Sequence, residues 1–256
     1  MITDTNVFLS RWPCRRLPDD ETAKLVAKLK SQGVTQAWAG SFDALLHNDV
    51  RAVNARLADE CRTHAPDMLL PFGAVNPTLS DWQEDVRRCA REHGFRGIRL
   101  HPNYHGYDLS DKRFVELLDL AGKYKLIVQI TLKMEDERTQ HRLLQVPQVD
   151  TAPLAGLLAE REGLKVVLTN SMRTLRGASL EKLAALGNVT FEISMLEGVG
   201  GIGKLITQVP YQRILFGSYA PFFYLESAVL KLRESELGDF VRKAITHENA
   251  AALLAR

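Results

Sequence analysis

The chain has 256 residues, of which 45% are hydrophobic, and its 33 basic residues nearly balance its 31 acidic ones. This length suits one (β/α)8 barrel, which typically needs about 250 residues, and it allows a large core without disulfide bonds. The balanced charge, with no clustered basic face, argues against a nucleic-acid-binding protein. No apolar run approaches the roughly 18 residues needed to cross a membrane, and we find no signal-peptide pattern. Three cysteines without C-x-x-C spacing are typical of reduced thiols, so we expect a cytoplasmic protein.

Eight short β-type segments are spread over the chain, with amphipathic helical stretches between them. The predicted strands are Ile2–Phe8, Thr35–Gly40, Leu69–Val75, Gly97–His101, Leu126–Thr131, Lys165–Asn170, Val189–Ser194 and Ile214–Tyr219. The predicted helices begin at Asp19-Asp20-Glu21, run from Ser80 to Gly94, and cover Lys112–Tyr124, Pro153–Arg161, Leu180–Leu186 and Glu226–Leu237. This alternation predicts an α/β fold, a single (β/α)8 TIM barrel formed by one domain over residues 1–256.

The alternative fold is an open, doubly wound sheet. Such sheets usually have a glycine-rich turn after the first strand. The turn here is Leu9-Ser10-Arg11-Trp12-Pro13, which contains no glycine, so the barrel is favoured.

The longest stretch without a predicted element is Lys133–Asp150, directly after the fifth strand. It is longer than an ordinary loop, and long insertions at the mouth of a barrel are usually functional. We therefore expect this segment to act as a lid.

Five stretches resemble the amidohydrolase-related branch of the amidohydrolase superfamily. They are ITDTNVF at the start, GFRGIRLHP, KVVLTNS, RILFGSYAPF and ITHENAAALL, and they occur in the family's order over nearly the whole chain. The resemblance implies a barrel with its site at the C-terminal ends of the strands. It also implies hydrolysis or, in some members, decarboxylation, usually with a divalent metal.

The resemblance further implies which positions would hold that metal. The family's His-x-His pair on the first strand corresponds here to Asn6 and Phe8, and the later ligand positions correspond to Thr131, Asn170 and Tyr219. Phe has no donor atom, and Asn, Thr and neutral Tyr are weak ligands for a transition metal. We therefore predict a site with no metal and no other cofactor.

These positions also indicate which residues point into the barrel, because side chains alternate along a strand. The inward set is Asp4, Asn6, Phe8, Arg99, His101, Gln129, Thr131, Asn170, Glu192, Ser194 and Tyr219. An interior that serves packing alone is rich in Val, Ile and Leu. Because buried polar groups are costly unless paired, this polar mouth predicts a small-molecule ligand.

His101 is the one inward histidine that we can place, and it is the candidate general acid or base. A structural role for His101 is equally compatible with the sequence. Arg99 either pairs with Asp4 or Glu192 inside the barrel or binds an anion, and Arg138 on the predicted lid is a second candidate for a substrate carboxylate.

The remaining candidates for substrate binding are hydrogen-bonding residues of the mouth. Their alternative roles are to lock the barrel's own network or, in the loop after the fourth strand, to be solvated, as we considered for Tyr104 and His105. The candidate set is Asn6, Tyr104, Gln129, Thr131, Asn170, Glu192 and Tyr219.

Three functions remain to be compared. We favour a metal-independent hydrolase, or related lyase, that acts on a small polar, carboxylated compound. The alternative is a ligand-binding pseudoenzyme that kept the pocket without the chemistry. A purely structural or partner-binding protein is disfavoured because the polar residues gather in the mouth rather than on an outer face. Barrels of this type often self-associate, so a homo-oligomer remains open.

Overall fold

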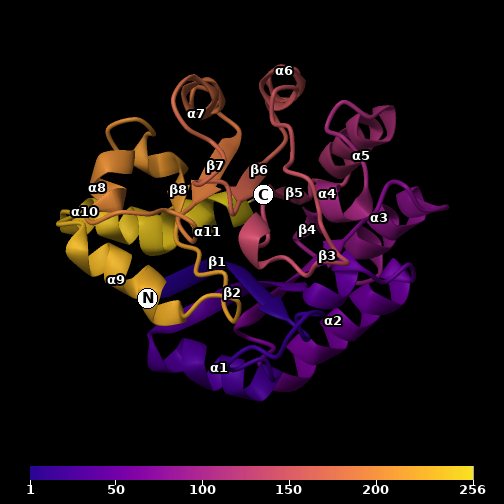
Figure 1. Ribbon diagram of the computed structural model, residues 1–256, viewed down its shortest axis with the longest axis horizontal. Helices are drawn as coiled ribbons and strands as arrows, with labels where there is room; N and C mark the ends of the chain where they lie inside the picture. Colours follow the sequence, from indigo (N-terminus) through magenta and orange to yellow (C-terminus); the bar gives the residue numbers. More distant parts are fainter. Residues whose placement is uncertain (256) are drawn as a thin grey trace.

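The computed structural model describes residues 1–255, and a barrel of eight parallel strands forms its centre (Figure 1). The strands are neighbours in chain order. They are β1 (Ile2–Leu9), β2 (Val34–Ser41), β3 (Leu69–Ala74), β4 (Gly97–Leu100), β5 (Ile127–Thr131), β6 (Val166–Thr169), β7 (Val189–Glu192) and β8 (Ile214–Leu215). Every predicted strand is present, seven of them with ends within two residues of those predicted, and the (β/α)8 prediction is confirmed.

Strand β8 is shorter than the predicted Ile214–Tyr219 because the chain leaves the β7 ladder after Leu215. The following residues run along β1 instead. There the backbone N–H of Tyr219 donates to Asn6 O (2.8 Å). This segment therefore closes the barrel between its first and last strands, while β8 itself stays two residues long.

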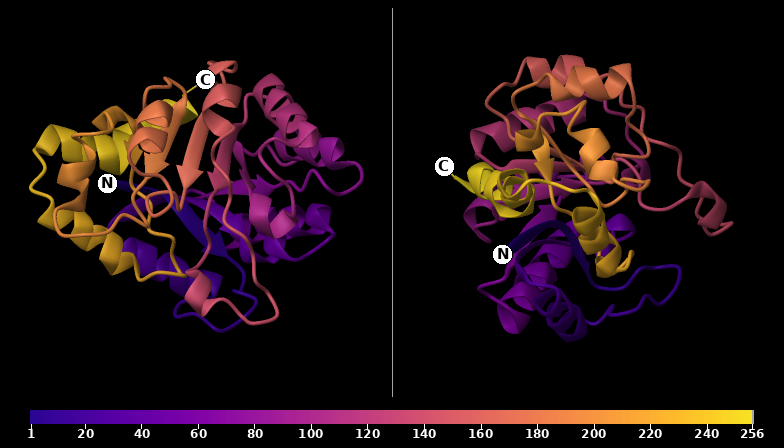
Figure 2. Two further views of the ribbon diagram at one scale, coloured as in Figure 1. Left: turned by 45° about the horizontal axis from the view of Figure 1, so that its top comes forward. Right: turned by 90° about the vertical axis from the view of Figure 1, so that its left-hand side faces the viewer.

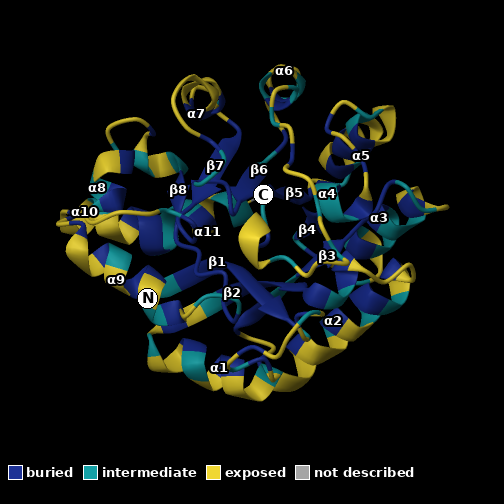
Figure 3. Ribbon diagram, viewed as in Figure 1, coloured by how far each residue is buried: buried dark blue, intermediate teal, exposed yellow. Residues whose placement is uncertain are grey.

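Helices surround the strands in Figures 1 and 2, and in Figure 3 the strands are buried while the outer faces of the helices are exposed. The helices are α1 (Thr22–Ser31), α2 (Val50–His64), α3 (Trp82–Arg91), α4 (Pro102–His105), α5 (Lys112–Lys123), α6 (Leu154–Ala159), α7 (Ala178–Ala184), α8 (Gly201–Leu205), α9 (Leu225–Glu234), α10 (Asp239–Lys243) and α11 (Asn249–Leu254). Three 3-10 turns, η1 (Phe42–Leu45), η2 (Glu137–Thr139) and η3 (Tyr211–Arg213), and a π-helical turn, η4 (Ala244–Glu248), complete the elements. Among residues 1–255, no helix combines the length and the apolar character that crossing a bilayer requires.

Helix α3 illustrates how the sequence pattern places these helices. Its buried residues Trp82, Val86 and Cys89 recur at helical spacing and therefore share the face that packs on the barrel. Acidic Glu84 in the first turn and basic Arg91 in the last suit the helix dipole. The helix begins two residues after the predicted start at Ser80.

The end of the barrel where the strands begin is filled by an apolar cluster. Trp38 of β2 stacks on Phe72 of β3, with ring centroids 4.7 Å apart. Ile127, Val167 and Ala250 of α11 belong to the same cluster. Since this end is packed, the polar interior lies at the other end, where the strands finish.

Candidate active site

Polar side chains fill the barrel toward the C-terminal ends of the strands. The buried members are Asp4, Asn6, Arg99, His101, Gln129, Thr131, Asn170, Glu192, Ser194 and Tyr219. Several of them bond across the barrel, as Asn6 does with Asn170 and Arg99 with Val7 O of β1, as expected for the predicted inward orientation. Bonds of this kind offset much of the cost of burying polar groups, so the polarity by itself does not demand a ligand.

Arg99 lies in the middle of the barrel, and each of its three side-chain nitrogens already donates a hydrogen bond. Nε donates to Gln129 Oε1 (2.7 Å), Nη1 to Val7 O (3.0 Å) and Nη2 to Trp38 O (3.1 Å). These bonds go to neutral oxygens on three different strands. Arg99 therefore ties the strands together from inside.

The aromatic ring of Phe8 covers Arg99. The guanidinium carbon lies 4.4 Å from the ring centroid, which is a cation–π contact. Burial lowers the pKa of Arg99 to about 9, while the more distant charges of Glu192 and Asp4 oppose this shift. The sequence left two roles open for Arg99. The first, direct pairing with Asp4 or Glu192, is wrong, because the hydrogen-bond acceptors of Arg99 are neutral oxygens. In the second, a ligand anion would have to displace Phe8 to reach the guanidinium group.

A second network joins β1, β6 and β7. Asn6 Nδ2 donates to Asn170 Oδ1 (2.7 Å) and to Glu192 Oε1 (3.3 Å). The backbone N–H of Asn170 donates to Glu192 Oε1, and that of Ser194 donates to Glu192 Oε2, both at 2.5 Å. Burial raises the pKa of Glu192 even though these bonds favour its charged form. One acceptor, Asn6 Oδ1, and one donor, Asn170 Nδ2, remain buried without a partner.

Asp4 has one satisfied and one unsatisfied carboxyl oxygen. Oδ1 accepts from the backbone N–H groups of Asn6 (3.1 Å) and Ser218 (3.0 Å), whereas Oδ2 is buried without a partner. Burial raises the pKa of Asp4 to about 7. Asp4 is therefore a buried group that exchanges its proton near neutral pH.

His101 follows β4 and projects into the mouth, where its ring lies 5.9 Å from the rings of both Phe8 and His105. Its Nδ1 atom is buried without a hydrogen-bond partner. Burial, together with the neighbouring His105 and Arg99, holds the pKa of His101 well below its usual value. The imidazole is consequently neutral, and one nitrogen is open.

His105 is buried as well, so its reading as a solvated loop residue is wrong. Pro102–His105 forms the short helix α4, which turns the ring inward, and Nε2 lies 2.8 Å from Ala44 O. A carbonyl oxygen can only accept, so Nε2 carries the proton and the unpartnered, buried Nδ1 is a free acceptor. Tyr104, one residue earlier, is half-buried against Trp12.

Aromatic rings cover the polar interior. This aromatic cap consists of Phe8, Trp12, Phe42, Tyr104, Tyr219, Phe222 and Phe223. Phe8 stacks on Phe42 with centroids 4.5 Å apart, and Tyr219 stacks on Phe222 at 4.8 Å. A ligand that reaches His101 must therefore pass or displace aromatic side chains.

The segment Lys133–Asp150, irregular apart from η2, crosses in front of the strands in the view of Figure 1. Tyr219 Oη donates to Met134 O (2.8 Å), Arg15 pairs with the buried Glu135 (3.4 Å), and Asn103 Nδ2 donates to Pro147 O (3.2 Å). These contacts fasten the segment to the loops after β8, β1 and β4. It therefore has the position expected of a lid.

Two other candidates differ in where they lie. Arg138 on η2 has a side chain that is 84% exposed and pairs with Asp136 (2.9 Å). Thr131 Oγ1 shares a hydrogen bond with Thr169 Oγ1 (2.9 Å) at the ends of β5 and β6. The structure thus brings Thr131 into the barrel wall and leaves Arg138 on the outer face of the lid.

Two mouth residues have a left-handed backbone that is unusual outside glycine. The φ angles are 53° at Asn170 and 62° at Tyr219. Asn170 is held by its N–H bond to Glu192, and Tyr219 by its N–H bond to Asn6 O. Such strained positions tend to gather at functional sites.

Sequence reasoning missed residues that reach the mouth through short loops. Trp12 and Phe222 reach the cap from the loops after β1 and β8. One signal was available for α4 and hence for His105, since Pro102 precedes and Gly106 follows the turn. Proline at the first helical position and glycine just after the last mark the two ends of a helix.

A protein-family model described as amidohydrolase matches residues 13–256. The chain belongs to the amidohydrolase family. No curated protein matches it in sequence. The strand-end network, cap and lid described above are thus features of an amidohydrolase-family barrel.

Solved structures with low sequence identity share this amidohydrolase-family fold. A 5-carboxyvanillate decarboxylase from Sphingomonas paucimobilis matches with a TM-score of 0.77 and 13% identity, covering 99% of this chain and 98% of its own. A 2,6-dihydroxybenzoate decarboxylase from Rhizobium matches with 0.75 and 15%, covering 99% of each chain. A dihydroxybenzoic acid decarboxylase from a Polaromonas species, solved with manganese and the inhibitor 2-nitroresorcinol, matches with 0.74 and 15%, covering 99% and 97%.

Proposed function

We propose that this member of the amidohydrolase family is a metal-independent hydrolase, or related lyase, that acts on a small polar, carboxylated compound. His101 is its general acid or base. The observation that carries the proposal is the open Nδ1 atom of His101, buried in the mouth without a protein partner. His105 also has an unpartnered Nδ1, but its Nε2 anchors the ring to Ala44 O, so His105 has a structural bond that accounts for its position.

The protonation state of His101 suits the role of a base. Because burial holds its pKa low, the ring is neutral at physiological pH, which is the form that a general base needs, and a bound substrate would have to raise its pKa for the proton to be taken up. Asp4, whose pKa of about 7 lies near the same pH, is a second proton-exchanging group in the same interior. Asn6, Gln129 and Asn170 would then orient a carbonyl group or a water molecule by hydrogen bonding.

We assign the substrate carboxylate to Arg138 rather than Arg99, which requires the lid to turn inward, because the side chain of Arg138 lies on the outer face of the lid. All three side-chain nitrogens of Arg99 already donate within the barrel, and Phe8 covers the guanidinium. Arg138 is bound only to Asp136 on the lid, so its partner could be exchanged for a ligand. Tyr104, Glu192, Thr131 and Tyr219 shape the surrounding mouth.

The proposal excludes a catalytic metal because of the donor atoms present. Among residues 1–255, no group of three or more His, Cys, Asp or Glu side chains is arranged to hold an ion. Asn6 and Asn170 bond to each other, and Phe8 offers no donor atom. Transition metals in proteins prefer imidazole, thiolate and carboxylate ligands, so this set does not fit one.

The second candidate function is a ligand-binding pseudoenzyme. It is favoured because the polar residues bond to the protein itself. Arg99, Asn6 and Glu192 each form hydrogen bonds with atoms of other strands or of the residues that follow them. The two functions differ in whether His101 performs a proton transfer.

The test is a turnover screen of small carboxylated compounds that follows both hydrolysis products and released CO2. We expect the parent to turn over one class and His101→Gln to lose about 10²- to 10⁴-fold in rate, because glutamine keeps polarity but takes up no proton. His47→Gln, at an exposed position, should retain full activity. A His101→Gln variant with unchanged turnover would retire the catalytic role. Binding that raises the melting temperature without any turnover would favour the pseudoenzyme.

A further inference from the structure

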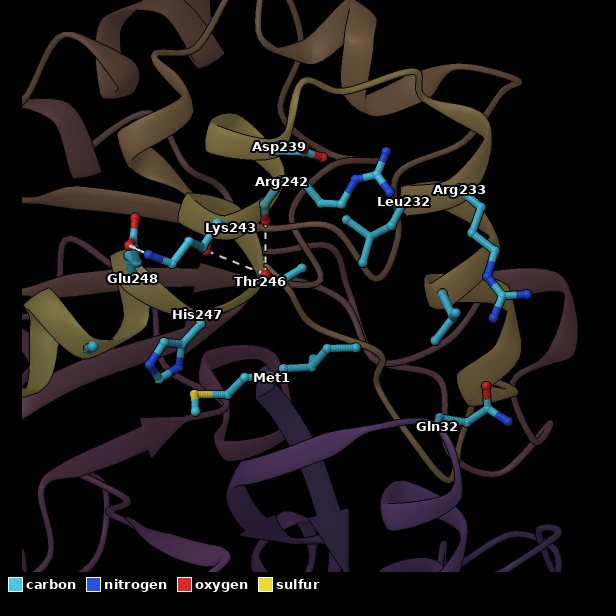
Figure 4. A pocket seen from close by; sticks show the side chains of 13 residues that line it. Met1, Gln32, Leu232, Arg233, Asp239, Arg242, Lys243, Thr246, His247 and Glu248 are labelled. Carbon is cyan, nitrogen blue, oxygen red and sulfur yellow. Dashed lines mark hydrogen bonds and ion pairs between the residues drawn. The ribbon is translucent and has the colours of Figure 1, made fainter.

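A cavity of about 990 Å³ lies outside the packed base of the barrel, between the start of β1 and the elements α9, α10 and η4 (Figure 4). Met1 and Ile2 line it at the start of β1, and Gln32 lines it just after α1. Because β1 runs from here toward the mouth, the cavity is separated from His101 by the length of the strand. Its volume is in the range of small-molecule binding sites.

The lining combines apolar side chains with unpaired guanidinium groups. Ile2, Val229, Leu232 and Ala251 supply apolar surface. In Figure 4, Arg233 of α9 and Arg242 of α10 lie on either side of Leu232. An anion placed between the arginines would therefore leave the rest of its molecule against apolar surface.

The charges of the lining leave these two arginines available. Lys243 pairs with Glu248 (2.7 Å), so those charges offset each other. Within residues 1–255, neither Arg233 nor Arg242 forms an ion pair, and Arg242 Nη2 donates only to Leu237 O (3.1 Å). Asp239 is the remaining acid of the lining, which gives the cavity a net positive charge.

One wall of the cavity is the π-helical turn η4, which is fixed on two sides. His247 Nδ1 lies 3.0 Å from Thr3 Oγ1 of β1, and the backbone N–H of Phe216, just after β8, donates to Ile245 O (2.9 Å). Turns of this kind are rare and occur frequently at functional sites. The wall is thus held in place before any ligand binds.

We propose that this cavity binds an amphipathic organic anion, an apolar chain that ends in a carboxylate. The carboxylate binds the guanidinium group of Arg233 or of Arg242, whose planar fork matches its two oxygens, and the positive charge of the other arginine adds to the attraction. The apolar side chains receive the chain. The site is independent of the mouth, so it exists whether or not the proposed reaction does.

The test is calorimetric titration of the full chain with decanoate. We expect saturable binding of one decanoate per chain, with decanol at least about tenfold weaker and inorganic phosphate without saturable binding, since each lacks one half of the recognised chemistry. Arg233→Gln and Arg242→Gln should each weaken decanoate binding about tenfold, and Arg62→Gln, an exposed arginine on α2, should leave it unchanged. Ala251→Leu, which fills the cavity from an exposed position, should weaken it too.

Two further measurements separate the alternatives. The His101→Gln variant should bind decanoate as the parent does, which distinguishes this site from the mouth. Equal affinity in the parent and both arginine variants, or no saturable heat with decanoate, would overturn the proposal. Sedimentation that shows a dimer disrupted by Ala251→Leu would also overturn it, because the cavity would then be an interface between two copies.

Discussion

Burial shifts the proton equilibria of Asp4 and His101 in opposite directions. It raises the pKa of the Asp4 carboxyl to about 7 and lowers that of the His101 imidazole, because in both cases the uncharged form is favoured away from water. Glu192, whose pKa is also raised, lies close enough to Asp4 to add to its shift. Burial in the mouth therefore favours the uncharged forms of Asp4, His101 and Glu192.

This shift predicts how the Asp4→Asn variant responds to pH. Between pH 4 and pH 7 the folded chain keeps a proton on Asp4 that the unfolded chain has released, so the contribution of Asp4 to stability falls as pH rises through this window. Asparagine lacks this dependence. The free energy of unfolding of Asp4→Asn, minus that of the parent, should therefore increase by about 3 kcal/mol between pH 5 and pH 8.

Urea denaturation of the parent and of Asp4→Asn at pH 5 and pH 8 measures this difference. Because both proteins contain the same other titrating groups, the contributions of those groups cancel in the comparison. Asp59→Asn, at an exposed position on α2, is the matched control and should show little change. An advantage of Asp4→Asn that is the same at pH 5 and pH 8 would contradict the assignment.

Which residues face inward could be predicted from the sequence, but what each one bonds to could not. Strand alternation is local, so it identified Asn6, Arg99 and Glu192 correctly as interior. Their partners depend on the register between strands and on backbone atoms, such as Val7 O for Arg99, that no residue pattern marks. The unpartnered Oδ2 of Asp4 escaped attention for the same reason.

At the scale of elements, the lid depends on a small number of bonds. The hydroxyl group of Tyr219 binds Met134 O at the point where the segment Lys133–Asp150 leaves β5. Tyr219→Phe removes this bond and leaves a buried carbonyl unsatisfied, at a cost of about 1–3 kcal/mol. We expect faster amide hydrogen exchange over residues 133–150 in this variant.

Exchange measured by mass spectrometry on the parent, Tyr219→Phe and Tyr224→Phe tests this prediction. Tyr224 is 70% exposed, so loss of its hydroxyl should leave the lid unchanged. Exchange over residues 133–150 that is identical in all three proteins would mean that the other contacts hold the lid alone.

Local patterns accounted for seven strands and for α1, α3, α5, α6, α7 and α9, whereas α2 and the remaining short helices were not predicted, and the patterns failed where tertiary contacts decide. The predicted six residues of β8 shrink to two because the chain turns to pair with β1, a neighbour more than 200 positions away. The sequence located the irregular segment Lys133–Asp150 correctly, and its role as a lid stays a prediction. The fastening of this segment to Arg15, Asn103 and Tyr219 arises only once the barrel brings three loops together.

For the whole molecule, the donor set predicts the metal content. Protein purified without added metal should carry less than about one tenth of an equivalent of zinc, manganese or iron, because the mouth offers mainly amide, hydroxyl and aromatic groups. Elemental analysis measures this. Adding manganese should leave the melting temperature unchanged, since a ligand stabilises only the state that it binds. A stoichiometric ion with anomalous signal at Asn6 or Asn170 would overturn the metal-free proposal.

The position of Trp12 gives the molecule its own optical reporter. The indole is 2% exposed and edge-on to Phe42 and Phe222 in the aromatic cap. Trp38 lies in the packed base of the barrel, and Trp82 is the first residue of α3, on its buried face; neither belongs to the aromatic cap. If ligand addition opens the cap, water reaches Trp12 and its fluorescence emission shifts to longer wavelength. This shift should be absent from a Trp12→Phe variant. Stopped-flow fluorescence would then give the rate of opening without any attached dye.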